Sequence, residues 1–221
     1  MAAMTKTITK RVEEYVLTTG ETLATAVASL HDIAQKAVLD MMKSLPADLV
    51  IPHITKIDGT GSTYNLADLN THVYAVYIDD HAAPVTYVSP DNFARAGLTG
   101  NYQVTSLDPI YTINRNSSNA RLQVLPGSLA FDVYAYSPTT IDCDADILGT
   151  STSVNEVPMI AHEAIILDIS IKVLYTKLND LVQNEEDPEM ATVITNQIQS
   201  LQSLYQFELQ KILGAPQEAA Q

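Results

Sequence analysis

The chain has 221 residues, of which 46% are apolar, and its formal net charge is −14. This apolar content supports a folded core and excludes wholesale disorder, while the negative charge disfavours a protein that grips DNA or an anionic membrane surface. The single cysteine, Cys143, excludes an internal disulfide and with it a secreted disulfide scaffold.

The N-terminal part of the chain is predicted to be helical. A first helix is expected over residues 9–17, and Gly20 should end it. A second helix is expected over residues 22–45, where apolar residues recur at helical spacing until Pro46, which cannot continue a helix. The first sixteen residues, MAAMTKTITKRVEEYV, contain no apolar run of the kind found in signal peptides, so none is expected.

The middle of the chain is rich in β-branched and tyrosine residues, which favour strands. Residues 56–70 are predicted to be a loop from their glycine and polar content. Strands are expected over 72–80 and 83–89, then one or two helical turns over 89–97, a hairpin over 108–126 and a strand over 131–137. In the last strand Phe131, Val133 and Ala135 should point to one side. The acidic stretch 138–155 is predicted to be a loop or a loose edge.

Two further helices are predicted in the C-terminal part, over 158–182 and 188–213. In the first of them apolar residues cover more than half of the circumference, with Ile166, Ile169 and Val173 widening the stripe. Such a helix should be buried on two sides, either within the subunit or against a neighbouring subunit. Charged residues interrupt its apolar sequence, so we predict a buried helix and no membrane span.

This order of segments predicts an α+β fold, because helices and strands are segregated along the chain. We expect a helical bundle built from the N- and C-terminal helices, with an inserted antiparallel β-rich subdomain. The expected boundaries are 1–50 for the N-terminal helices, 51–156 for the insert, and 157–221 for the C-terminal helical pair and tail. The three parts together should make one folded unit.

The best metal candidate in the sequence is DCDAD, which places Asp142, Asp144 and Asp146 at alternate positions. Alternating carboxylates are typical of a calcium loop, but that loop needs a glycine where Ile147 stands and a glutamate where Ser153 stands. A solvated acidic edge that discourages strand pairing explains the same residues. We therefore predict no metal site, and keep a metal-binding module built on these residues as an alternative.

No catalytic motif is complete in the sequence. The pair His162–Glu163 would need a histidine at position 166 to make a zinc-protease helix, and Ile166 stands there. The segment GTGST at 59–63 lacks the Gly-Lys-Ser/Thr ending of a phosphate loop, and no G-x-S-x-G sequence is present. We therefore predict a protein that is not an enzyme and that binds no cofactor.

Several motifs together resemble those of head-to-tail adaptor proteins, also called neck or connector proteins, of tailed bacteriophages. They are LPADLV after the first helices, SPDNFARAG, the strand pair DPIYTIN and RLQVLP, and the C-terminal sequence HEAIILDISIKVLYTKL. The strand pair matches at Asp108 to Tyr111 and at Leu122 to Pro126, and the helix matches from Pro158 to a tyrosine near its end, Tyr175. The resemblance covers most of the chain, through motifs that are individually loose.

The resemblance implies a virion protein of the phage neck that is synthesised in the host cytoplasm. Such proteins form a ring, commonly of twelve identical subunits, between the portal protein and a tail tube or nozzle protein. DNA passes through the channel as cargo only, which an acidic lumen permits. Another ring of the neck or tail, such as a tail terminator or a nozzle, is the alternative within this class.

Candidate interaction residues come from the matched motifs, from the turn of the hairpin and from the wide apolar stripe of the helix predicted over 158–182. The turn of the hairpin, NRNSSN, is too polar and too long for a tight two-residue turn. Its tip is therefore either a docking loop or a solvated loop. Aromatic residues of the matched motifs and the widened helix stripe add further candidates. The full set is Tyr111, Arg115, Asn116, Arg121, Ile166, Ile169, Val173 and Tyr175.

Overall fold

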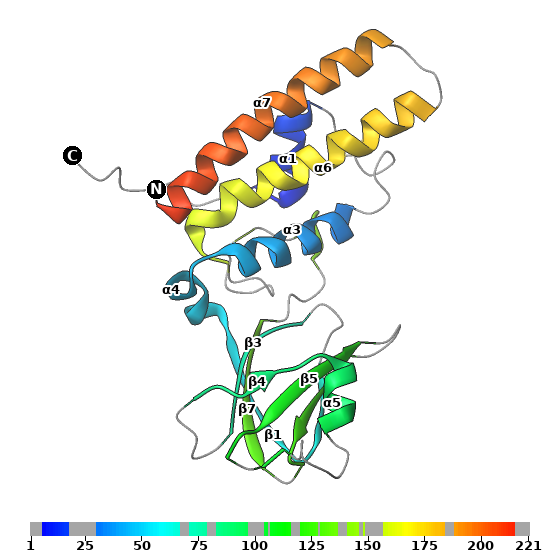
Figure 1. Cartoon of the computed structure of the whole chain (residues 1–221). Helices are drawn as coiled ribbons and strands as arrows, with labels where there is room; N and C mark the ends of the chain where they lie inside the picture. The colour runs from blue at the N-terminus through cyan, green and yellow to red at the C-terminus, as the bar shows by residue number, and fades with distance from the viewer. Residues whose placement is uncertain are drawn as a thin grey trace, which may run out of the picture. The chain divides into compact units, whose positions relative to one another are not determined.

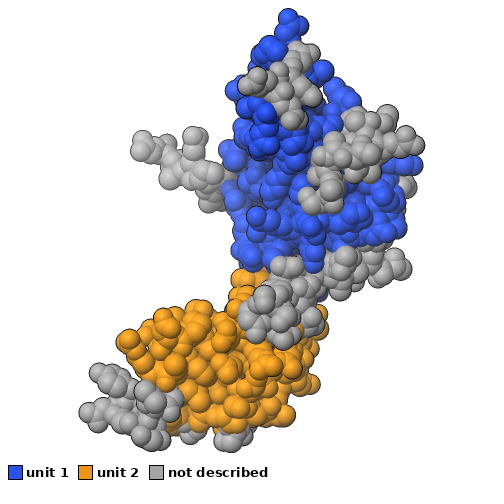
Figure 2. Space-filling model, turned by 90° about the vertical axis from the view of Figure 1, so that its right-hand side faces the viewer, with its two compact units in different colours: residues 1–53, 138–221 blue, residues 54–137 orange. Residues whose placement is uncertain are grey.

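The computed structural model describes residues 6–17, 30–66, 71–78, 83–96, 104–105, 107–115, 120–127, 129–136, 141–145, 148, 157–183 and 188–214. The structure is mixed α and β, as predicted, and it divides into two compact units (Figure 2). A helical unit contains residues 1–53 and 138–221, and a β unit contains residues 54–137. The predicted insert 51–156 therefore differs at its second boundary, because residues 138–156 are grouped with the helices.

The helical unit is organised around its second-longest helix, α6 (His162–Gln183), which a 3₁₀ turn over Met159–Ala161 precedes. This helix contacts α1 (Ile8–Val16), α3 (Leu30–Ser44) and α7 (Pro188–Leu213). Figure 1 shows α6 between α3 and α7. The predicted helices of both terminal regions are thus present, although residues 22–29 of the predicted second helix lie outside the described residues. No helix in the described part of the chain is long and apolar enough to cross a membrane.

The surroundings of α6 explain its unusually wide apolar stripe. Ile166, Ile169 and Val173 are all fully buried within the helical unit itself. The sequence left open whether a neighbouring subunit covers this stripe, and the structure shows that α1, α3 and α7 of the same chain do. Their candidacy as interaction residues is therefore wrong, because no partner can reach them on the folded surface.

Local sequence signals set the ends of these helices. The side chain of Thr7 caps α1 by accepting a hydrogen bond from the backbone nitrogen of Lys10, and Leu17 ends the helix in the left-handed conformation with φ 51°. After α3, Pro46 precedes the short helix α4 (Ala47–Val50) and a 3₁₀ turn over Ile51–His53. The sequence predicted only an exit from the helix at this point, since four residues carry too little periodicity to identify a helix.

The β unit consists of two sheets that share one core. One sheet has the order β1-β7-β3, and the other has the order β2-β6-β5-β4. Among the described strands, every pair is antiparallel except β4 with β5, which is parallel. The strands are β1 (Thr55–Thr60), β2 (Thr63–Leu66), β3 (His72–Ile78), β4 (Thr86–Tyr87), β5 (Ile110–Arg115), β6 (Ala120–Leu125) and β7 (Ala130–Tyr136), and α5 (Pro90–Ala96) packs on β5.

Alternation along the strands places the core between the two sheets. Phe131, Val133 and Ala135 of β7 are buried, which confirms the predicted alternation, and they cluster with Leu122 and Val124 of β6 from the other sheet. The predicted strand is also confirmed over 72–78, as are the paired strands of the hairpin and the helical turns at 90–96. Burial of this apolar surface from both sheets, at roughly 25 cal/mol per Å², is what holds the β unit together.

The prediction of a loop over residues 56–70 is wrong for residues 56–60 and 63–66, which form strands, and residues 67–70 lie outside the described residues. This region contains β1, which pairs with β7, and β2, which pairs with β6. Gly59 of β1 is buried directly opposite Phe131, so the glycine that suggested a loop instead makes room for an aromatic ring. Gly61, with φ +89°, provides the turn that carries the chain from one sheet to the other.

Candidate functional site

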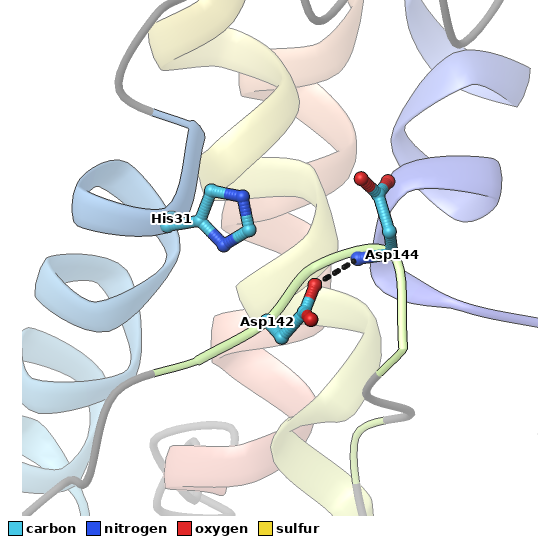
Figure 3. A group of neighbouring side chains, drawn as sticks. All are labelled: His31, Asp142 and Asp144. Atoms are coloured by element: carbon cyan, nitrogen blue, oxygen red, sulfur yellow. Dashed lines mark hydrogen bonds between the residues drawn. The ribbon is translucent and has the colours of Figure 1, made fainter.

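The structure brings His31, Asp142 and Asp144 together on the surface of the helical unit (Figure 3). His31 lies in the first turn of α3, and the two aspartates lie in the turn segment 141–145. One potential ligand atom from each side chain lies within 4.8 Å of the corresponding atoms of the other two, and all three residues are exposed. Two carboxylates and an imidazole in this arrangement are able to bind a divalent cation.

Segment 141–145 is held in place by hydrogen bonds to two helices. The Nδ1 atom of His31 lies 2.7 Å from the carbonyl oxygen of Ile141 and 3.3 Å from the backbone nitrogen of Cys143. From α1, the hydroxyl of Thr9 donates to Oδ1 of Asp144 at 2.6 Å, and the backbone nitrogen of Thr9 donates to the carbonyl of Cys143 at 3.0 Å. These contacts are the physical reason that residues 141–145 belong with the helices and not with the β unit.

The two aspartates also shape the segment itself. Oδ1 of Asp142 accepts from the backbone nitrogens of Asp144 at 3.1 Å and of Ala145 at 3.4 Å, which is an Asx turn. Cys143 points inward and is fully buried. Alternating aspartates therefore serve a turn here, and the predicted use against edge-to-edge strand pairing is not what the structure shows for Asp142 and Asp144.

The sequence identified two of the three clustered residues. Asp146, the third aspartate of the predicted set, lies outside the described residues. His31 was missed because it lies 110 residues before Ile141 and carries no ligand spacing to the aspartates. Only the folding of segment 141–145 against the start of α3 makes it a neighbour.

The hairpin residues proposed for docking have mixed surroundings. Arg115 and Arg121 are exposed on β5 and β6, but Nη2 of Arg115 donates to the carbonyl of Thr71 at 2.8 Å, so this arginine also ties the hairpin to the start of β3. Asn116 lies outside the described residues. Among the described residues, no side-chain hydrogen bond or ion pair is seen for Arg121. Arg121 is therefore the hairpin candidate whose side chain is most available to a partner.

The two candidate tyrosines differ in accessibility. Tyr111 is only 7% exposed, and its ring makes an edge contact with that of Tyr87 at a centroid distance of 5.5 Å. Tyr87 is exposed, so it is the accessible ring of this pair, and Tyr111 as a contact residue is wrong. Tyr175 is 43% exposed on α6, and its hydroxyl accepts a hydrogen bond from Nε2 of Gln202 at 2.9 Å.

Helix α7 has an apolar face that the sequence did not separate from its core stripe. Its core face is buried through Ile194, Ile198, Leu201 and Ile212. A second face is exposed and carries Met190, Val193, Leu204 and Phe207, whose spacing places them within about 100° on one side of the helix. Periodicity alone shows that the helix is amphipathic, without showing how much of its apolar surface a neighbour covers.

The opposite side of α7 borders an open groove against α6 with a volume of about 580 Å³. Its lining is polar on the α7 side, where Gln199, Gln202, Ser203 and Gln206 contribute, and Asp168 and Ile171 line it from α6. Asp168 already pairs with Lys172, whose Nζ lies 2.7 Å from its carboxylate. The polar side of α7 thus lines this groove, and none of the four residues of the exposed apolar face does.

Partly buried polar contacts connect α1 to α6. The carboxylate of Glu163 accepts hydrogen bonds from the guanidinium of Arg11 and from the hydroxyl of Tyr15. Burial, together with this hydrogen bond, raises the pKa of Tyr15 to about 12. Burial also lowers the pKa of His162, whose ring lies 3.1 Å from the carbonyl of Val157. Glu163 is therefore a structural anchor, and its neighbour His162 is a core histidine.

Comparison with known proteins does not assign the chain to a family. No protein-family model matches the chain, and no curated protein sequence matches it.

Proposed function

We propose that this chain is a structural subunit of a homo-oligomeric ring in the neck of a tailed bacteriophage, where the ring joins the portal protein to the tail. In this proposal the helical unit is the bundle of a head-to-tail adaptor and the β unit is its inserted subdomain. The portal protein, neighbouring copies of the chain and a tail tube or nozzle protein are its partners. The ring lines the channel through which DNA passes, and the chain performs no catalysis.

The observation that carries this proposal is the exposed apolar face of α7. Val193, Leu204 and Phe207 are 59%, 46% and 56% exposed, and Met190 lies on the same side. Fully burying a side chain of this kind stabilises a complex by roughly 1.5–3 kcal/mol, and an exposed apolar face of this extent is typical of an interaction surface. In a ring of identical subunits, one such face on each copy is buried at every contact.

The negative charge of the chain is a second observation that supports this proposal. The formal net charge is −14, and residues 51–156 contain eleven acidic and only four basic side chains. An acidic surface repels phosphate, so DNA moves past it without being bound. This property suits a channel through which DNA passes as cargo.

Ring formation is tested by mass measurement and negative-stain microscopy of the purified chain, alone and with the portal protein. We expect closed rings in at least the second sample, because subunits of an assembly often become ordered only on docking. The triple substitution Val193→Ser, Leu204→Ser and Phe207→Ser should abolish the rings. About half of each side chain is already exposed in the monomer, so the urea midpoint should fall less than it would for the same substitutions in the core.

Gln206→Ser, on the polar side of the same helix, is the matched control and should leave the rings intact. Monomers alone in the presence of the portal protein would contradict the proposal. Intact rings formed by the triple variant would show that the exposed face of α7 is not the subunit contact. Localisation of the protein in intact particles by microscopy then distinguishes the neck from other rings of the tail.

A further inference from the structure

We propose that His31, Asp142 and Asp144 bind one divalent transition-metal cation of the Zn²⁺ type, and that the ion fastens segment 141–145 to α3. This site is independent of ring formation and of any contact with the portal protein. It differs from the calcium loop considered from the sequence, because one donor is an imidazole and comes from a helix instead of the loop.

The chemistry of the donors selects the class of cation. Imidazole nitrogen is a common ligand of Zn²⁺ and of neighbouring transition metals, whereas Ca²⁺ and Mg²⁺ prefer sites built from oxygen alone. Two carboxylate oxygens and one nitrogen fill three positions, which leaves a fourth position for water in a tetrahedral site. The mixed donor set therefore favours Zn²⁺ over Ca²⁺.

The distances fit a site that closes by small side-chain rotations. Three atoms that lie within 4.8 Å of one another leave a central point at most about 2.8 Å from each of them when they are equally spaced. Zinc bonds to nitrogen and carboxylate oxygen are about 2.0–2.2 Å long, so each side chain must move by less than about 1 Å. All three side chains are exposed and have room for this movement.

Contacts around the site already orient its donors. The ring of His31 is held by Ile141, Asp142 is held by two backbone nitrogens, and Asp144 is held by the hydroxyl of Thr9. Hydrogen bonds of this kind around ligands are what fixes their direction in metal sites. Asp144 has no cationic side chain as a partner among the described residues, so a bound cation would supply the missing positive charge.

The test is calorimetric titration of the tag-free full chain, stripped with a chelator, with ZnCl₂, CaCl₂ and MgCl₂ in turn. We expect one Zn²⁺ site with a dissociation constant in the micromolar range, and at least about tenfold weaker binding of Ca²⁺ and Mg²⁺. His31→Gln, Asp142→Asn and Asp144→Asn should each weaken Zn²⁺ binding by at least about tenfold. Asp142→Asn retains the oxygen that accepts from the backbone, so it removes the charge while leaving the Asx turn in place.

Asp32→Asn is the matched control, because Asp32 is an exposed aspartate next to His31 on α3 and is not part of the group. Cobalt provides a second readout, since Co²⁺ bound in the site should show visible absorption bands that His31→Gln abolishes. Circular dichroism identifies any variant that fails to fold. The Zn²⁺ affinities of the folded variants then decide whether these side chains bind the ion. Absence of saturable Zn²⁺ binding up to about 1 mM, or unchanged affinity in the folded His31 and Asp144 variants, would overturn the proposal.

Discussion

Gly59 of β1 lies directly opposite Phe131 of β7, and a Cβ atom on Gly59 would lie 2.6 Å from Cζ of Phe131 and closer still to Cε2. The ring is 1% exposed and has little room to move. We therefore expect Gly59→Ala to lower the free energy of unfolding by about 1–3 kcal/mol, as overpacking in a core does, although alanine is the better strand residue. Urea denaturation measures the loss.

Thr60→Ala, at an exposed position of the same strand, should change the stability by less than about 0.5 kcal/mol. In a Phe131→Leu background the further effect of Gly59→Ala should shrink, because the smaller side chain leaves space for the added methyl group. Equal effects of Gly59→Ala in both backgrounds would show that the ring is not the cause.

Replacing tyrosine by phenylalanine should change the free energy of unfolding in different directions at two positions. The hydroxyl of Tyr15 donates to Glu163, so Tyr15→Phe should lower the free energy of unfolding by about 1–2 kcal/mol. The hydroxyl of Tyr136 is buried and has no hydrogen-bond partner among the described residues, so Tyr136→Phe should be neutral or stabilising by up to about 1 kcal/mol. Denaturant titration of the two variants side by side checks the difference in sign, and a loss at Tyr136 equal to that at Tyr15 would contradict it.

Alkaline pH should destabilise the β unit. Burial raises the pKa of Tyr74 to about 12 and also raises that of Tyr111 and Tyr136, against about 10 in the unfolded chain. The folded state therefore binds the phenol protons more tightly than the unfolded chain does. The contribution of these tyrosines to the free energy of unfolding is complete below pH 10 and is lost as the pH rises from about 10 to about 12. The urea midpoint should fall over this range, and less steeply in Tyr74→Phe. A midpoint that stays constant to pH 11.5, or an equal slope in the variant, would contradict the prediction.

The thiol of Cys143 should report on the opening of segment 141–145. Cys143 is fully buried, and its Sγ lies 3.7 Å from the carbonyl of Leu30. A thiol reagent should react at least about tenfold more slowly with the native chain than in urea, because reaction requires local opening. Thr9→Ala removes the hydrogen bond to Asp144 and should accelerate the reaction, whereas Ser203→Ala on α7 should not. A native rate equal to the rate in urea would show that the segment is open.

The long helices could be predicted because each carries enough turns for a periodic pattern to stand out. Periodicity does not show what covers a stripe, however. The stripes of α6 and α7 look alike in sequence, yet Ile169 is fully buried by the same chain and Val193 is 59% exposed. Interaction candidates chosen from the α6 stripe were wrong for this reason, and the exposed face was found only from the packing of the helices.

The strands β1 and β2 could not be predicted because their stability comes from distant partners. Gly59 pairs with Phe131 and Asn65 pairs with Arg121, so the local preference of a glycine-rich, polar segment for a loop is overridden by the sheets. The same limit applies to the candidate metal group. Two aspartates at alternate positions are visible in the sequence, but their neighbour His31 is brought to them only by the packing of segment 141–145 on α3.

The register of β1 against β7 has a consequence for how the chain tolerates genetic change. Thr55 and Ala135 are register partners, so the first and last strands of the β unit place its two ends beside each other. A segment whose ends are neighbours can be exchanged or removed at one position of the host without stretching the flanking chain. The β unit is thus suited to diversify as a module, while the helices encoded on either side of it keep a common core.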